Sequence, residues 1–439
     1  MSKVVFDINK EIGKIKIMHA VNNGPVIAGT DQVRGNGAEY KAARIPFART
    51  HDAAFFSGYG GSHTVDVHAI FPDFSADEND PASYDFACTD NYMKQIISCG
   101  TKPFYRLGSK IEHEVKKYGT LVPKDFAKWA RICEHIIAHY NEGWADGFEY
   151  GIEYWEIWNE PDLDTDDSKN KRCWGGTEAQ FADMFIIAAT HLKNRFPTLK
   201  IGGPSSAGDE SWMDRFLERI KKANTPLDFF SWHWYWTEPY DMSIKCTRIR
   251  KLLEKHGYGN VESIMNEWNY VRCWTKEFVY SIEQIIGIKG AAFTAACMSA
   301  AQHNPDVDML MYYDARPTAF NGLFDLYTYR TLKGYYPFYI FANLYELGNQ
   351  MESVSDDEDV YAVCAKKGDN VEIMLTYYAE DDNKYSKIID IDFGGYDMTG
   401  ARFFLTDASH TMIEKRLEIV DGKMNIRLER NSILYIEKK

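Results

Sequence analysis

The sequence predicts an α/β fold: a (β/α)8 TIM barrel followed by an accessory C-terminal antiparallel β-sandwich. Three observations predict it. Short apolar or β-branched runs alternate with stretches of helical period through the first three quarters of the chain. After about Leu347 the pattern changes to short alternating segments separated by polar turns. The length of 439 residues is too great for one ordinary core and fits a barrel plus a smaller domain.

Candidate strands and helices alternate through the barrel region. The strands are Ile15–Val21, Ile45–His51, Lys102–Leu107, Tyr154–Asn159, Leu199–Gly203, Asp228–Tyr235, Glu262–Trp268 and Met309–Asp314. The helices are Tyr84–Ser98, Lys124–Tyr140, Glu178–Arg195, Ser211–Lys222, Ile244–Lys255, Ser281–Gln302 and Tyr336–Leu347. The first crossover, residues 29–40, is glycine-rich and has mainly loop character. A doubly wound open sheet is the alternative, but no glycine-rich phosphate turn follows the first strand.

The C-terminal segments predict a second domain. Its candidate strands are Val360–Ala365, Val371–Tyr378, Lys387–Asp392, Arg402–Thr406, Leu417–Val420, Met424–Leu428 and Ile433–Glu437. The N-terminal run Val4–Ile8 precedes the barrel and can pair with this sheet. We therefore expect a barrel over residues 10–349 and a sandwich over residues 350–439, joined by residues 1–9.

Composition limits the classes of partner. The net charge of −14, with no basic run that contains interleaved aromatics, excludes a nucleic-acid footprint. The eight cysteines are scattered, without a C-x-x-C pair or histidines at zinc spacing, so neither a metal nor an organic cofactor is expected. No stretch predicts a membrane span or a signal peptide. We expect a cytoplasmic protein that binds neither nucleic acid nor membrane, and a homo-oligomer is left open.

The most specific motif is YWEIWNEP, residues 154–161. An alternating strand ends here in Asn-Glu-Pro, and proline stops both a strand and a helix. The carboxyl ends of barrel strands face the active site, so Asn159 and Glu160 are expected to project toward a substrate. A carboxyl group among aromatic side chains is desolvated, which raises its pKa and suits a general acid. A surface glutamate is the alternative for a bare Asn-Glu pair, but the whole motif favours catalysis.

A second glutamate, Glu267, ends the seventh candidate strand within SIMNEWN. Strands four and seven lie across the mouth of an eight-stranded barrel, so Glu160 and Glu267 can converge. Retaining glycosidases need two carboxyl groups about 5 Å apart, one to protonate the leaving oxygen and one to attack the anomeric carbon. The pair therefore predicts Glu160 as acid/base and Glu267 as nucleophile. The neighbouring Asn266 is expected to be structural.

The sixth candidate strand, FFSWHWYW, supplies further candidates between the two glutamates. Alternation places Ser231, His233 and Tyr235 on one face, with three tryptophans on the other. We expect His233 and Tyr235 to face the barrel mouth, with the tyrosine hydroxyl orienting the nucleophile. Trp236 lies just past the strand, where stacking on a sugar face and a packing role are both open.

Strands two and three also deliver polar residues to the predicted catalytic face. Arg49 and His51 lie on one face of strand two and are candidates for contacting sugar hydroxyls or holding Glu267 ionised. Pairing of Arg49 with barrel carboxylates for structure is the alternative. The segment Arg106–His113 follows strand three, and we expect it to be a solvated loop rather than a reader of substrate substituents.

Together these strings resemble family 39 of the glycoside hydrolases, in clan A of the (β/α)8 glycosidases. WEIWNEP resembles the family's acid/base motif, SWHWY its His-x-Tyr strand, and Ala48–His51 its Arg-Phe-His segment on strand two. Further similar segments are Tyr84–Phe104, Gly322–Phe324, Lys333–Pro337 and Leu344–Gly348. The resemblance covers most of the barrel.

The resemblance implies roles for individual residues. Glu160 matches the acid/base, Glu267 the nucleophile and Asn159 the partner of the sugar 2-hydroxyl, while His51, His233 and Tyr235 match the surrounding shell. A β-sandwich beside the barrel is also implied. The chain departs from the family pattern in having Asn266 where threonine is common. It also has Arg106-Leu107-Gly108 where the xylosidases have Glu-Leu, so the sugar stays undetermined between β-xylosidase, α-L-iduronidase and other specificities.

The leading expectation is an exo-acting retaining hydrolase of β-xylosides or related short glycosides, working through a glycosyl-enzyme without a metal or cofactor. A transglycosidase or a glycosidase of other specificity in the same clan is the nearest alternative. A non-catalytic sugar-binding barrel is a second. A metal-dependent barrel hydrolase is a third, but no His-x-His appears on the first strand.

Overall fold

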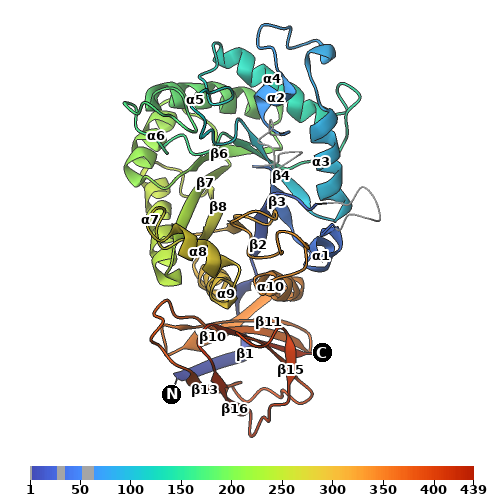
Figure 1. The fold of residues 1–439 in the computed structure, drawn as a ribbon, viewed down its shortest axis with the longest axis vertical. Coiled ribbons are helices and arrows are strands. Elements are labelled where there is room, and N and C mark those ends of the chain that lie inside the picture. Colours follow the sequence, from blue (N-terminus) through green and yellow to red (C-terminus); the bar gives the residue numbers. More distant parts are fainter. Residues whose placement is uncertain (1, 27–34, 52–63) are drawn as a thin grey trace.

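The computed structural model describes residues 2–26, 35–51 and 64–439 (Figure 1). Eight parallel strands close into a barrel in the order of the chain. They are β2 (Ile17–Asn22), β3 (Phe47–Arg49), β4 (Lys102–Leu107), β5 (Tyr154–Ile157), β6 (Lys200–Ser206), β7 (Phe229–Trp236), β8 (Glu262–Tyr270) and β9 (Met309–Tyr312). The predicted barrel is confirmed, and the open doubly wound sheet is wrong because β2 pairs with β9.

Helices surround the barrel as predicted, with a few differences, among them the short helix α2 (Val67–Ile70), which was not predicted. They are α1 (Gly37–Ala42), α2 (Val67–Ile70), α3 (Ala87–Ser98), α4 (Phe126–Asn141), α5 (Glu178–Arg195), α6 (Glu210–Lys222), α7 (Pro239–Lys255), α8 (Phe278–Ile285), α9 (Ile288–His303) and α10 (Tyr335–Leu347), with a 3-10 turn at Pro81–Ser83. The single helix expected over Ser281–Gln302 is broken into α8 and α9, bent by 78°, because Gly287 adopts an extended backbone. The first crossover ends in α1, and its residues 29–34 lie outside the described residues.

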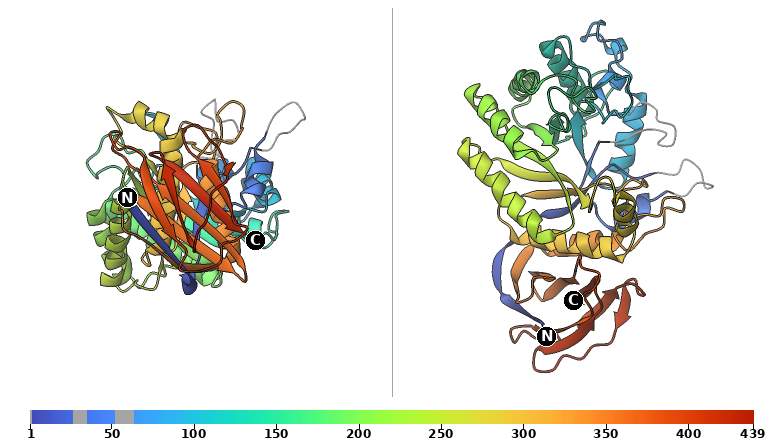
Figure 2. Two further views of the ribbon diagram at one scale, coloured as in Figure 1. Left: turned by 90° about the horizontal axis from the view of Figure 1, so that it is seen from below. Right: turned by 60° about the vertical axis from the view of Figure 1, so that its left-hand side comes forward.

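The second domain is one nine-stranded sheet that folds over its own apolar core (Figure 2). Its strands, in sheet order, are β15 (Ile413–Lys415), β14 (Arg402–Thr406), β17 (Ser432–Lys438), β12 (Asn370–Tyr377), β11 (Val360–Lys367), β10 (Asn349–Ser355), β1 (Ser2–Lys14), β13 (Lys387–Asp392) and β16 (Lys423–Leu428). The sheet is mixed rather than purely antiparallel, because β1 arrives from the other end of the chain and pairs with β13 in parallel. The strands β10 and β15 were not predicted.

One predicted strand of this domain, Leu417–Val420, is wrong. Leu417 and Ile419 pack against the apolar core of the sheet, which accounts for the alternating pattern. Within the described chain this segment makes an isolated bridge between Val420 and Lys423 instead of a ladder. Alternating apolar and polar residues indicate that every second side chain is buried, and a segment can bury them without pairing to a neighbouring strand.

The two domains meet through α9 and α10, which pack between the barrel and strands β11 and β12 (Figures 1 and 2). Residues 288–303 of α9 are buried along most of their length, so this helix is apolar on all sides. Among the described helices none is by itself long and apolar enough to cross a membrane, although the bent pair α8 and α9 passes that test when joined.

The barrel interior has an apolar plug below a polar layer. Phe104 stacks on Tyr154 and meets Phe229 edge-on, with ring centroids 4.9 and 5.2 Å apart. These rings fill the amino-terminal half of the barrel with other inward-facing apolar residues. The next inward-facing positions toward the carboxyl ends of the strands are polar, and two of them are Arg49 and Glu156. A rigid floor therefore supports a charged layer just below the mouth.

Candidate active site

The chain turns sharply after β5 and aims Glu160 at the barrel mouth. Trp158 and Glu160 have φ angles of 79° and 46°, in the left-handed region that costs a residue about 1–3 kcal/mol. The turn is held from both sides, because the Trp158 amide donates to the Leu107 carbonyl and the Glu160 amide donates to the Ser205 carbonyl, at 2.7 and 2.8 Å. Backbone bonds to the two neighbouring barrel strands thus offset the local strain.

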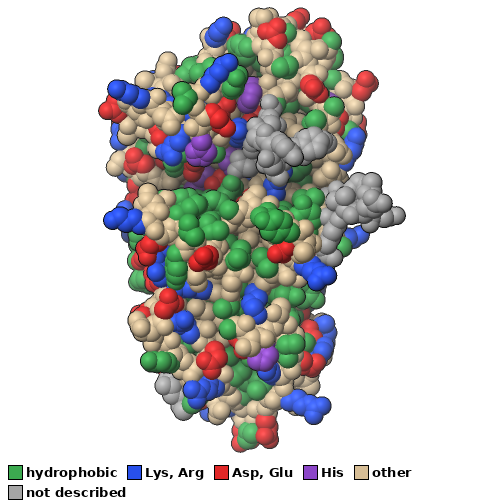
Figure 3. Space-filling model, in the orientation of Figure 1, with side chains coloured by type: hydrophobic (Ala, Val, Ile, Leu, Met, Phe, Trp, Pro, Cys, Tyr) green, Lys and Arg blue, Asp and Glu red, His purple; other side chains and the backbone are tan. Residues whose placement is uncertain are grey.

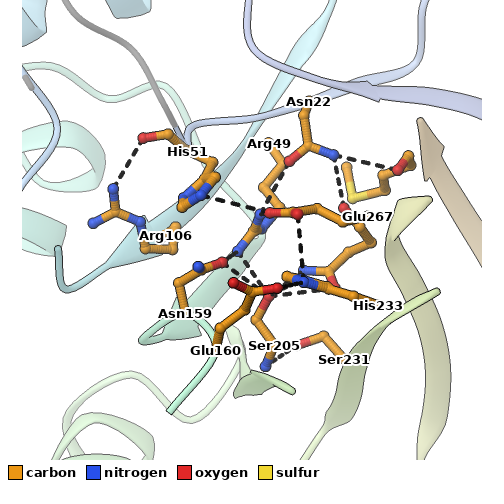
Figure 4. Close-up of polar contacts among 12 residues, drawn as sticks. Asn22, Arg49, His51, Arg106, Asn159, Glu160, Ser205, Ser231, His233 and Glu267 are labelled. Atoms are coloured by element: carbon orange, nitrogen blue, oxygen red, sulfur yellow. Dashed lines mark hydrogen bonds and ion pairs between the residues drawn. The ribbon is translucent and has the colours of Figure 1, made fainter. Parts of the chain in front are cut away.

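Glu160 and Glu267 lie face to face with His233 between them (Figure 4). Nδ1 of His233 is 2.8 Å from Oε1 of Glu160 and 3.4 Å from Oε2 of Glu267. One side-chain nitrogen or oxygen atom from each of these three residues lies within 4.8 Å of the other two. Such a separation fits the roughly 5 Å of a retaining pair and is too short for the roughly 6.5–9.5 Å that an inverting pair needs for its water.

Glu267 is the more enclosed of the two carboxylates and is held by donors. Its Oε1 accepts from Nη1 of Arg49 at 2.8 Å, and its Oε2 accepts from the Tyr235 hydroxyl at 2.8 Å. Nε2 of His51 lies 3.6 Å from Oε1. Burial raises the pKa of Glu267 to about 7, while Arg49 and the Tyr235 hydroxyl favour the ionised form and oppose that rise.

Arg49 organises the polar layer below the carboxylates. Its side chain is fully buried, so it contacts protein groups rather than a substrate. Its three nitrogens donate, at 2.6–3.0 Å, to Glu156, Glu267, Asn22, Asn159 and Ser205. One guanidinium therefore fixes the nucleophile and its neighbours at once, as a planar five-donor group can. Of the three roles considered for Arg49, the geometry supports holding Glu267 and pairing with barrel carboxylates rather than contact with sugar hydroxyls.

His233 and Asn159 complete the contacts around Glu160. Burial lowers the pKa of His233 to about 4, so its imidazole is neutral near pH 7. Its Nε2 lies 2.6 Å from the Ser205 hydroxyl. The Asn159 amide oxygen is fixed by Arg49, whereas its Nδ2 is buried without a partner in the described part of the chain. A buried unpaired donor beside two carboxylates is positioned for a ligand oxygen.

Several residues of this site were not predicted. Glu156 accepts from Arg49, from the Ser231 hydroxyl and from Nδ2 of Asn266, which confirms the structural expectation for Asn266. The sequence did contain a signal for Glu156. It lies two residues after Tyr154, on the same inward-facing side of the strand, and a carboxylate buried there requires a cation as partner. Ser205 belongs to a glycine-rich strand that gives no comparable signal.

Cys173 also reaches the site from the segment between β5 and α5. Its Sγ lies 3.8 Å from Oε2 of Glu160, and its carbonyl accepts from the Trp158 indole at 2.9 Å. Burial raises the pKa of the Cys173 thiol well above its usual range, so the thiol is a neutral contact of Glu160.

The segment Arg106–His113 is packed, which corrects the expectation of a solvated loop. Arg106 is fully buried, pairs with Asp66 at 2.6 Å and donates to the His51 carbonyl at 2.9 Å. Glu112 is also buried and accepts from the backbone amides of Tyr118 and Gly119. The prediction was wrong because it took the charged residues of this segment to be solvated, whereas Arg106 and Glu112 are buried with partners inside the protein.

Trp236 lies at the end of β7 on the side opposite Tyr235. It is half-exposed, and its indole donates to Asp241 of α7 at 3.1 Å. His233 and Tyr235 both point to the carboxylates, which is the alternation expected for this strand; the register shift beside His233 comes from an extra residue, Asn266, on β8. The role of Trp236 stays a prediction.

Comparisons with known proteins give the same fold. The chain superposes on a glucosidase from Croceicoccus marinus with a TM-score of 0.81 and 23% identity, covering 100% of this chain and 98% of that one. A monomeric β-xylosidase from Caulobacter crescentus CB15 matches with a TM-score of 0.70 and 16% identity, covering 100% and 99%. The α-L-arabinofuranosidase of Thermotoga petrophila RKU-1 matches at 0.71 and 14%, covering 100% of both.

Sequence comparisons identify the family. A β-xylosidase from Caldicellulosiruptor saccharolyticus is 28% identical over 170 residues, which are 36% of this chain and only 32% of that protein. The family model for glycosyl hydrolases family 39 matches residues 14–302, which is more than half of the chain and covers both glutamates. The chain therefore belongs to family 39 of the glycosyl hydrolases.

Proposed function

We propose that this protein is a retaining glycoside hydrolase that acts by double displacement. The observation that carries the proposal is the Glu160–Glu267 pair, whose carboxylate oxygens approach within 4.8 Å across His233. Membership of family 39 supports the reaction class. A non-catalytic sugar-binding barrel would not need both carboxylates at this separation.

In the first step Glu267 attacks the anomeric carbon while Glu160 gives its proton to the leaving oxygen. The glycosidic C–O bond breaks and an ester bond to Glu267 forms, so the leaving group departs as a neutral alcohol. Arg49 and Tyr235 hold one oxygen each of Glu267, which keeps the carboxylate oriented for attack. The Glu160 side chain is 15% exposed and that of Glu267 6%, so the acid is the group that an outgoing alcohol can reach.

In the second step Glu160, now ionised, takes a proton from water as that water attacks the anomeric carbon. The ester to Glu267 breaks, and the sugar leaves with the anomeric configuration it had in the substrate. Neutral His233 suits both states of Glu160. In one tautomer Nδ1 accepts a hydrogen bond from protonated Glu160 while Nε2 donates to the Ser205 hydroxyl. In the other tautomer Nδ1 donates to ionised Glu160.

The proposed substrates are β-xylosides or related short glycosides, cleaved one sugar at a time. Two similar proteins, from Caldicellulosiruptor saccharolyticus and Caulobacter crescentus, are β-xylosidases and support the xyloside, and a third is a glucosidase. Nδ2 of Asn159, which has no partner among the described residues, supplies a donor for a hydroxyl next to the anomeric carbon.

A release assay tests this function directly. Purified protein is offered nitrophenyl α- and β-glycosides of xylose, glucose, galactose, arabinose and glucuronic acid, beside Glu160→Ala and Glu267→Ala. We expect nitrophenyl β-xyloside to be hydrolysed by the parent and not by Glu267→Ala. Release of another sugar, lost in the same variant, would keep the reaction class and change the substrate. Binding without release from any glycoside, natural disaccharides included, would favour a sugar-binding barrel.

Activity is expected to be unchanged by a chelator. Glu160, His233 and Glu267 are a group of potential metal ligands, but their polar atoms already contact one another and Arg49, Tyr235 and Ser205. Initial rates after dialysis against EDTA, with and without added Zn²⁺, Mn²⁺ or Mg²⁺, check this. Loss of activity on dialysis that a metal restores would replace the two-carboxylate scheme.

The pH dependence is expected to report Glu267. The nucleophile must be ionised, and its pKa of about 7 places the acidic limb of kcat/KM well above the range of an ordinary glutamate. Tyr235→Phe removes a hydrogen bond that stabilises the ionised form of Glu267. The pKa of Glu267 therefore rises, and the acidic limb of the kcat/KM profile moves to higher pH. The matched control is Tyr385→Phe, an exposed tyrosine of the second domain. A limb that stays in place in Tyr235→Phe would contradict this role for Tyr235.

A further inference from the structure

A cluster of aromatic rings borders the nucleophile. It consists of Trp274, Phe278, Tyr313, Phe320 and Tyr235 and is called the aromatic wall below. Trp274 is central, with its ring 5.1 Å from that of Tyr235, 5.9 Å from that of Phe278 and 6.0 Å from that of Phe320. The Tyr313 and Phe320 rings are 5.6 Å apart. Tyr235 lies near the carboxyl end of β7 and the other four residues follow β8 and β9, so the wall stands on the catalytic face.

The aromatic wall is continuous with the catalytic groups. Its Tyr235 donates to Glu267, and its Tyr313 ring lies 6.3 Å from the ring of His51, which itself approaches Glu267. In Figure 3 apolar side chains gather over the start of α8, beside a hollow in which histidine side chains are visible. A ligand held at the two carboxylates therefore has the wall as its neighbour.

The aromatic wall is held in place by polar bonds from both domains. Nδ2 of Asn269 donates to the Tyr313 and Phe320 carbonyls at 2.6 and 2.9 Å. Arg272, two residues before Trp274, donates its Nε to Glu380 of the second domain at 2.8 Å. The loop that carries Tyr313 and Phe320, and the segment that leads to Trp274, are thus anchored before a ligand arrives, which reduces the entropy lost on binding.

The rings are also open to solvent. Trp274 is 55% exposed, although it belongs to a packed cluster whose other members are partly buried. Exposed aromatic surface at the rim of a cleft is a marker of ligand binding, and a flat ring suits the apolar face of a sugar. Trp236 is exposed to a similar extent, but it lies across the strand from Tyr235 and bonds to α7.

We propose that the aromatic wall is a second sugar subsite, in which Trp274 stacks on the ring next to the one held at Glu160 and Glu267. This rests on the proposed function and extends it, because it assigns the protein a substrate of at least two sugar rings. It also gives the second domain a part in recognition, since Glu380 supports the segment that carries Trp274.

Binding to a catalytically silent background tests the subsite without turnover. In Glu160→Gln, calorimetry compares xylobiose with xylose, and we expect the disaccharide to bind more tightly. Adding Trp274→Ala is expected to lower the affinity for xylobiose about tenfold and to leave that for xylose unchanged. Trp274→Phe keeps a flat ring and should retain most of the affinity, which also excludes misfolding as the cause. Tyr385→Ala removes a still more exposed aromatic ring from the second domain and serves as the control.

Two results would overturn the subsite: no advantage of xylobiose over xylose in the parent, or an advantage that survives Trp274→Ala. If Trp236→Ala abolishes the advantage instead, the stacking ring is Trp236 and the assignment is wrong. The release assay on nitrophenyl glycosides is independent of these outcomes. A protein that hydrolyses a glycoside but shows no Trp274 effect keeps the proposed function and loses only the subsite.

Discussion

Glu267→Ala is expected to lower kcat/KM by at least about 10⁴-fold, the largest effect of any substitution in this protein. The reason is that no glycosyl-enzyme can form without the attacking carboxylate. Sodium azide can then occupy the vacated space and attack the anomeric carbon directly. Because only one displacement takes place, the glycosyl azide should have the anomeric configuration opposite to that of an activated aryl glycoside. Proton NMR of the product gives this configuration.

Glu160→Ala is the matched variant, because it removes the other carboxylate of the pair. An activated aryl glycoside still forms the glycosyl-enzyme there, and azide replaces water in the second step. The glycosyl azide should then retain the substrate's configuration, as two displacements restore it. If Glu160→Ala gave the inverted glycosyl azide and Glu267→Ala the retained one, Glu160 would be the nucleophile and Glu267 the acid/base. Azide rescue of neither variant would contradict the double-displacement scheme.

Arg49→Met is expected to have the largest effect on stability, with a loss of about 3–5 kcal/mol in the free energy of unfolding. Methionine fills much of the volume but leaves Glu156 and Glu267 buried without their shared cation. Without Arg49, which favours the ionised form, burial raises the pKa of Glu267 further in the folded variant. The loss of stability should therefore be smaller at acidic pH, where less of Glu267 ionises in the unfolded state, and grow as the pH rises. Urea denaturation at pH 5 and pH 8 measures it.

The control for this prediction is the double variant Arg49→Met/Glu156→Gln. Removing one of the two uncompensated charges should recover part of the stability and reduce its pH dependence, which a simple packing defect would not do. If Arg49→Met unfolds at the same urea concentration as the parent at pH 8, the buried ion pairs do not stabilise the fold.

Local patterns in the sequence determined the elements that a single segment can specify. The alternation of apolar runs and helical stretches predicted the barrel, because each βα unit buries its own apolar face. WEIWNEP predicted the end of β5 within two residues, since proline cannot continue the ladder. The spacing of β5 and β8 around a closed barrel predicted that Glu160 and Glu267 converge, as their separation shows. The parallel pairing of β1 with β13 was missed, because it joins segments distant in sequence. The break at Gly287 was also missed, because the helical periodicity continues across this one extended residue.

The tertiary structure alone decided how the site is held and what borders it. Arg49 joins groups from β2, β5, β6 and β8, and no window of sequence contains these partners. The aromatic wall likewise brings Trp274 against Phe320 from another loop, although each was one aromatic residue among many in the sequence. The physical reason is that hydrogen bonds and ring contacts between strand ends depend on barrel closure. Periodicity, by contrast, records only which side of its own element a residue buries.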